Sequence, residues 1–156
     1  TTSNTPANSG IAAPTVLGAA VFAGGSYTQA GSVPCSFVAQ WLQAPFPSAS
    51  PSPSASRVPG ASVSPAWSAL GTGLNNFANT MAVDDHALYV GGNFGTAGVT
   101  ALRVAPWSGT AWSAARGAGV SGDDSHVEAL ALFDGALYSG GWFKTVGGVN
   151  SSCIAR

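Results

Sequence analysis

The chain has 156 residues, of which only 7% are charged, and its formal net charge is −1. Nucleic acid is not expected as a partner, because a phosphate-binding face needs clustered Lys and Arg, and the five basic residues here are scattered. No apolar run approaches the length of a membrane-spanning helix, so the sequence predicts no membrane span.

Residues 1–10 are predicted to form an N-terminal extended segment ahead of the first strand. They contain neither the basic region nor the apolar region of a secretory signal peptide. We therefore expect a processed or trimmed end.

One motif then occurs three times along the chain. Its forms are VFAGGSY at 21–27, LYVGGNF at 88–94 and LYSGGWF at 137–143, and the paired glycines are Gly24, Gly25, Gly91, Gly92, Gly140 and Gly141. The second pair follows the first by 67 residues, whereas the third follows the second by 49. Self-similarity at a fixed spacing indicates one supersecondary unit that is copied and stacked, because a single unit cannot bury both of its faces.

The interval between the first and second glycine pairs is longer because additional residues are inserted between two tryptophans. Trp107 and Trp112 are five residues apart, whereas the matching Trp41 and Trp67 are 26 apart. The inserted residues, 44–64, are almost wholly Pro, Ser and Ala. Such a segment buries too little apolar surface to recover its ordering entropy, so we predict an exposed, polyproline-like loop.

Each repeat contains up to four short stretches with strand character, and no stretch shows sustained helical periodicity. The first alternates and ends at a turn, the second carries the glycine pair, and the third and fourth contain the two tryptophans. We therefore predict an all-β, β-propeller-like fold of three repeats of four short antiparallel strands. The first blade comprises 11–43 and 65–77, the second 78–119, and the third, lacking its fourth strand, 120–156.

The double glycine after an apolar strand, followed about 15 residues later by Trp107 and then Trp112, resembles the kelch and galactose-oxidase type of propeller blade. The fuller phrase looks like the repeats of large secreted bacterial and algal surface proteins. Galactose oxidase holds copper with tyrosines, histidines and a Cys–Tyr crosslink, and no such cluster can be matched in this sequence. The resemblance therefore implies a blade, while no cofactor is expected and the activity is not carried over.

The paired glycines are predicted to lie where a strand passes close to another backbone or a bulky aromatic, so that any Cβ would clash. A phosphate-cradling loop would need a strand-to-helix turn instead. The four repeated tryptophans are predicted to pack in the core or between blades. Trp142 takes the place of Ser26 and Asn93, so the repeat does not demand it, and it is either a surface aromatic or a sugar-stacking residue.

Two features suggest attached sugar. The sequence SASPSPS at 48–54 resembles the Ser-Pro modules of hydroxyproline-rich glycoproteins of plants and green algae. The resemblance implies O-linked sugar on hydroxylated Pro47, Pro51 and Pro53, or on the serines Ser48, Ser50, Ser52 and Ser54. Asn150 begins an Asn-Ser-Ser acceptor, which we expect in the loop after Gly147 and Gly148.

The two cysteines, Cys35 and Cys153, fall at the entry to the third strand of the first and third repeats. With a whole repeat between them, their Cα atoms should lie beyond the roughly 7 Å limit for a disulfide, unless the repeats curl strongly. We therefore expect partners outside the chain or free thiols, and the presence of two cysteines is compatible with a secreted protein without proving it.

The remaining polar residues suggest no catalytic site. The pairs Asp84-Asp85 and Asp123-Asp124 are too few and too close for a calcium loop and are predicted to cap turns. Neither His86 nor His126 has a further ligand at metal-binding spacing, and no Ser or Cys lies in a nucleophile elbow. We therefore expect no enzyme activity and no metal.

The sequence thus favours a structural or adhesive extracellular glycoprotein, a propeller building block of a cell wall, sheath or surface appendage. A lectin-like carbohydrate-binding module is the alternative, and a secreted propeller enzyme is a distant third. The expected partners are other segments or copies of the same or a related extracellular protein, and glycans. Residues 153–156 are predicted to pair as a strand at an edge that another segment or chain completes.

Overall fold

The computed structural model describes residues 10–42, 66–115, 119–151 and 153–156. In these ranges the regular structure consists of strands, with no helix, and the strands form five small antiparallel sheets. The all-β prediction is confirmed.

Three of the five sheets correspond to the three repeats, and in each the strands lie in chain order. Repeat 1 contains β1 (Ile11–Leu17), β2 (Ala20–Gly25), β5 (Val38–Leu42) and β6 (Ala66–Ala69). Repeat 2 contains β7 (Ala78–Val83), β8 (Leu88–Gly92) and β9 (Val104–Trp107). Repeat 3 contains β11 (His126–Phe133), β12 (Ala136–Trp142) and β15 (Ile154–Ala155).

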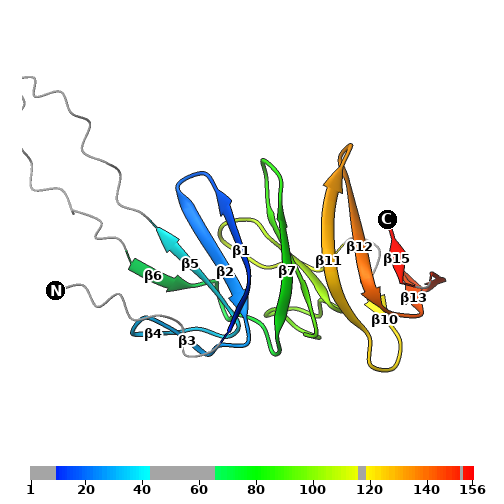
Figure 1. The fold of residues 1–156 in the computed structure, drawn as a ribbon, viewed down its shortest axis with the longest axis horizontal. Coiled ribbons are helices and arrows are strands. Elements are labelled where there is room, and N and C mark those ends of the chain that lie inside the picture. The colour runs from blue at the N-terminus through cyan, green and yellow to red at the C-terminus, as the bar shows by residue number, and fades with distance from the viewer. Residues whose placement is uncertain (1–9, 43–65, 116–118, 152) are drawn as a thin grey trace, which may run out of the picture.

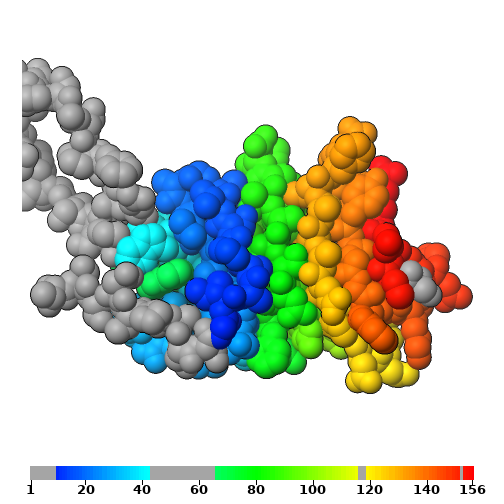
Figure 2. Space-filling view, in the orientation of Figure 1, coloured from blue at the N-terminus to red at the C-terminus, as the bar shows by residue number. Residues whose placement is uncertain are grey.

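The three sheets are stacked in the order of the chain (Figure 1). The first strand of each repeat packs on the first strand of the next, so β1 contacts β7, and β7 contacts β11. Figure 2 shows the same succession as blue, green and orange layers. Repeat 2 therefore has a neighbour on both faces, whereas repeats 1 and 3 each have one within the described chain.

Short hairpins join the second and third strands of repeats 1 and 3, where the sequence suggested only a glycine-bearing loop. They are formed by β3 (Gln29–Ala30) with β4 (Val33–Pro34) and by β13 (Thr145–Val146) with β14 (Val149–Asn150). Left-handed glycines make the tight turns possible: Gly31 has a φ of 61°, and Gly147 and Gly148 have 56° and 80°. A further short strand, β10 (Val120–Ser121), pairs with β13.

The fourth strand of repeat 2 is shorter than expected. Trp112 forms a single antiparallel bridge with Trp107, and the Ser113 N–H donates to the Pro106 carbonyl at 3.0 Å. Pro106 has no N–H to donate in return, which limits the ladder at this position.

The buried side chains lie between the repeats as well as within them. The largest cluster joins repeats 1 and 2 and includes Phe22, Leu70, Leu88, Trp107 and Trp112. A second cluster joins repeats 2 and 3 around Val104, Val127 and Phe143. Burial of these apolar surfaces is what stabilises the stack, at roughly 25 cal/mol per Å².

Candidate functional site

The second glycine of each pair lies against the backbone of a β-bulge. The strand pairing shifts register between Ile11 and Ala13, between Ala78 and Thr80, and between Val127 and Ala129, opposite the three glycine pairs. A Cβ on Gly25, Gly92 or Gly141 would lie 2.1, 2.1 or 2.3 Å from the carbonyl oxygen of Gly10, Phe77 or His126. A side chain cannot be placed there without moving the bulge.

The same glycine also marks a recurring backbone turn into the third strand. The N–H of Gly25, Gly92 and Gly141 donates at 3.0–3.1 Å to the carbonyls of Phe37, Arg103 and Cys153. These three acceptor residues have φ values of 65°, 75° and 70°. The recurrence of this left-handed residue in all three repeats shows that Phe37, Arg103 and Cys153 occupy equivalent positions.

The first glycine of the first two pairs faces the next repeat. A Cβ on Gly24 would lie 2.5 Å from Met81 Cε and 2.8 Å from Ala78 Cβ, and one on Gly91 would lie 2.8 Å from Val127 Cγ1. These glycines therefore let the following sheet approach closely. We call Gly24, Gly91 and Gly140, with the surface around them, the glycine seats.

The third seat is open. A Cβ on Gly140 would have only the Cys153 carbonyl oxygen at 3.7 Å and Ala129 Cβ at 3.8 Å as its nearest described neighbours, which is ordinary contact distance. The glycine is present at the repeated position, but no described neighbour requires it.

The four repeated tryptophans form two cross-strand pairs. Trp41 and Trp67 pair in register with ring centroids 5.4 Å apart, and Trp107 and Trp112 have centroids 5.0 Å apart. The Trp107–Trp112 pair is buried between repeats 1 and 2, and Trp112 Nε1 donates to the Leu70 carbonyl at 2.8 Å. The Trp41–Trp67 pair occupies the equivalent place on repeat 1 and is half-buried.

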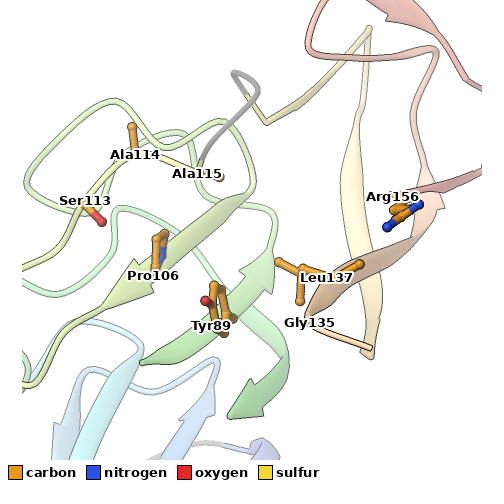
Figure 3. A pocket seen from close by; sticks show the side chains of 9 residues that line it. Tyr89, Pro106, Ser113, Ala114, Ala115, Gly135, Leu137 and Arg156 are labelled. Atoms are coloured by element: carbon orange, nitrogen blue, oxygen red, sulfur yellow. The ribbon is translucent and has the colours of Figure 1, made fainter. Parts of the chain in front are cut away.

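A cavity of about 660 Å³ lies between repeats 2 and 3 and is lined in part by Tyr89, Ser113, Leu137 and Arg156. Figure 3 shows Tyr89 and Ser113 on one wall and Leu137 and Arg156 on the other. By strand register, Tyr89 of repeat 2 is the counterpart of Phe22 of repeat 1. Likewise, Leu137 of repeat 3 is the counterpart of Leu88 of repeat 2. At the first interface, those counterparts pack with the Trp107–Trp112 pair. The cavity therefore occupies the region that a tryptophan pair fills between repeats 1 and 2.

Trp142 is exposed at the end of β12 and belongs to a small polar surface. Its side chain is 69% exposed, and its ring lies 15° from parallel with the His126 ring, at 6.4 Å between centroids. His126 Nε2 lies 3.3 Å from the Glu128 carboxylate. An exposed indole beside hydrogen-bonding groups has the chemical character of a sugar-stacking surface.

The glycosylation sites of the sequence interpretation divide into two groups. Asn150 is exposed, but it lies in β14 opposite Thr145 and not in a loop, because the turn at Gly147 and Gly148 closes a tight hairpin. The Ser-Pro module, which contains Pro47, Pro51, Pro53, Ser48, Ser50, Ser52 and Ser54, lies outside the described residues, as do the other residues of the predicted insertion 44–64.

Both cysteines are free thiols. Cys35 is buried, and this burial raises the pKa of its thiol, with a backbone hydrogen bond at Ala30 opposing the shift. Cys153 is exposed beside the open seat of Gly140. The two thiols therefore differ in accessibility.

Among the aspartates that were predicted to cap turns, Asp84 makes contacts of that kind. The Asp84 carboxylate accepts hydrogen bonds from the N–H groups of His86 and Ala87, each at 2.7 Å, and from the Tyr89 hydroxyl at 3.0 Å. Partial burial raises the pKa of Asp84, but these hydrogen bonds outweigh it and hold the value below the ordinary range. Lys144 Nζ lies 3.2 Å from the exposed Asp123 carboxylate.

Across residues 10–42, 66–115, 119–151 and 153–156, no three His, Cys, Asp or Glu side chains converge as a metal site. No helix that could cross a membrane occurs in these ranges. Comparison with known protein families, with curated proteins and with solved structures finds no match to the chain.

The sequence drew attention to the glycines and tryptophans but not to the apolar residues exposed at the two ends of the stack. Those on repeat 1 include Ile11, Val16 and Val21, and those on repeat 3 include Phe133 and Ile154. The sequence did contain information about these exposed residues. Alignment of the repeats through their glycine pairs relates each of them to a counterpart in another repeat.

Proposed function

We propose that the three repeats are consecutive blades of a β-propeller. We further propose that the chain serves as a structural or adhesive segment of an extracellular glycoprotein, as a building block of a cell wall, sheath or surface appendage. The propeller is supported by the order of strands in each sheet, which is an antiparallel meander, and by the stacking of successive first strands.

The observation that carries the building-block function is the repeated glycine seat. Two seats accept the next repeat in direct contact, and the third has the same backbone but no described neighbour. Such units gain stability by adding neighbours at matching faces, which suits a polymer or a large scaffold. The Ser-Pro module and the exposed Asn150 support an extracellular, sugar-bearing setting.

Material purified from the native source tests this function. Intact-mass measurement, glycopeptide mapping of residues 44–57 and of Asn150, and surface labelling with an antibody should show attached sugar and a location outside the cell. A mass equal to that of the bare polypeptide, together with antibody signal inside the cell, would contradict the proposal.

Carbohydrate binding is the second candidate, and the exposed Trp142 beside His126 and Glu128 favours it. A glycan array would show binding that is lost in Trp142→Ala. Phe133→Ala is a matched control, since Phe133 is also a highly exposed aromatic but lies at the far end of β11. Binding that both variants retain, or no binding at all, would argue against this function.

A further inference from the structure

The outward face of repeat 1 carries apolar residues whose counterparts in the other repeats are buried. Ile11 pairs opposite Gly25, as Ala78 pairs opposite Gly92 and Val127 opposite Gly141. Ala78 and Val127 are both 0% exposed, because each contacts the preceding repeat, whereas Ile11 is 48% exposed. We call Ile11, Pro14, Val16 and Val21 the head face.

Val21 and Val16 follow the same pattern. Val21 is the counterpart of Leu88, which is fully buried against repeat 1. Val16 is the counterpart of Val83, which packs on the same cluster. Both valines remain exposed on repeat 1.

The outward face of repeat 3 shows the complementary pattern. Ile154 pairs opposite Gly140, as Val38 pairs opposite Gly24 and Val104 opposite Gly91. Val38 and Val104 are 0% and 4% exposed, whereas Ile154 is 71% exposed. We call Gly140, Tyr138, Ile154 and Phe133 the tail face.

The head face and the tail face are expected to fit each other, because contacts of the same kind already occur twice within the chain, between repeats 1 and 2 and between repeats 2 and 3. The Gly24 seat accepts Ala78 and Met81, and the Gly91 seat accepts Val127 and Leu130. By strand register, Ile11 of the head face is the counterpart of Ala78 and Val127, and Pro14 is the counterpart of Met81 and Leu130. A head face placed on the tail face would therefore present apolar side chains of similar kind to the open seat of Gly140.

The charges on the two faces do not oppose this contact. None of the residues of the head face or the tail face is charged. The charged side chains nearest in sequence are Asp134, which follows Phe133, and Arg156, which lines the cavity between repeats 2 and 3. Two apolar surfaces that are exposed in isolation are expected to associate when their shapes agree.

We propose that a second copy of this chain docks by its head face on the tail face of the first, and so continues the stack through the glycine seat of Gly140. The contact is heterologous, so that successive copies close into a ring if the rotation permits and extend into a filament if it does not. This inference deepens the proposed building-block function and rests on it, since it names the partner at the open seat.

Variants at the two faces test the proposal on the chain of residues 1–156 produced without sugar. Val16→Glu places a charge on the head face. Gly140→Glu places one on the tail face, where an added Cβ would meet its described neighbours only at ordinary contact distance. Sedimentation velocity should show association of the wild type that rises with concentration. Each variant alone should associate at least about 100-fold more weakly, because its charge would be buried unpaired.

The decisive measurement mixes the two variants. The Val16→Glu chain keeps its tail face and the Gly140→Glu chain keeps its head face, so the mixture should form a one-to-one dimer and nothing larger. Val99→Glu, at an exposed valine in a loop, should associate like the wild type. Circular dichroism and denaturation midpoints confirm folding, and Ile11→Glu and Ile154→Lys replace any variant that fails to fold.

Three results would overturn the proposal: a wild type that remains monomeric at every concentration, association that survives both single variants, or a mixture that does not pair. A head-to-head or tail-to-tail contact would be recognised by the loss of association in one variant only. These results leave the sugar content and location of the native protein unaffected, so they are separable from the test of the proposed function.

Discussion

Substitution of Gly92 by alanine should destabilise the protein, whereas the same substitution at Gly140 should not. In Gly92→Ala the new Cβ would lie 2.1 Å from the Phe77 carbonyl oxygen, and that oxygen also accepts the Asn93 N–H at 3.0 Å. Forcing the bulge apart costs about 1–3 kcal/mol of strain and about 1 kcal/mol for the weakened hydrogen bond. Alanine also reduces the conformational freedom of the unfolded chain, which offsets about 0.5–1 kcal/mol of this destabilisation.

The net expectation for Gly92→Ala is a loss of about 1–3.5 kcal/mol in the free energy of unfolding. In Gly140→Ala the unfolded chain is restricted in the same way but no clash arises, so the free energy of unfolding should rise by about 0.5–1 kcal/mol. Urea denaturation followed by tryptophan fluorescence measures both. Equal stabilities for the two variants, or a Gly92→Ala protein as stable as the wild type, would refute the steric argument.

Three further outcomes are expected. Trp112→Phe removes the donor to the buried Leu70 carbonyl and should cost about 1–3 kcal/mol in thermal unfolding. Because the pKa of Asp84 lies below its ordinary value of 3.8, its carboxylate stabilises the fold above that pH and loses this effect as the pH falls through the pKa of the folded state. Asp84→Asn should therefore destabilise the protein at neutral pH. In acid denaturation curves, the difference in stability from the wild type should vanish. A thiol reagent should label exposed Cys153 quickly and buried Cys35 only on unfolding, as counted by mass spectrometry.

Much of the architecture could be predicted from the recurrence of the glycine pairs. The pairs located the second strand of each repeat, and the alternation before them located the first strand. The predicted reason for the glycines, that another backbone passes where a Cβ would lie, corresponds to the contacts of Gly25, Gly92 and Gly141 with the bulges. Steric demands of this kind leave a direct trace in the sequence, because few residues other than glycine can meet them.

Other features left no comparable trace. The hairpin of β13 and β14 depends on the left-handed conformations of Gly147 and Gly148, which the sequence permits but does not require. The open seat at Gly140 could not be predicted, because the residue is the same as at Gly24 and Gly91, and only the packing of the next sheet distinguishes them. The pairing of His126 with Trp142 depends likewise on the bulge that sets their register.

The bulge that opens each first strand also bears on curvature. A bulge increases the local right-handed twist of its strand, and here it occurs at the same register in β1, β7 and β11. Each of the three first strands is consequently bent at the same place, so the shape that a sheet offers to its neighbour recurs from one repeat to the next.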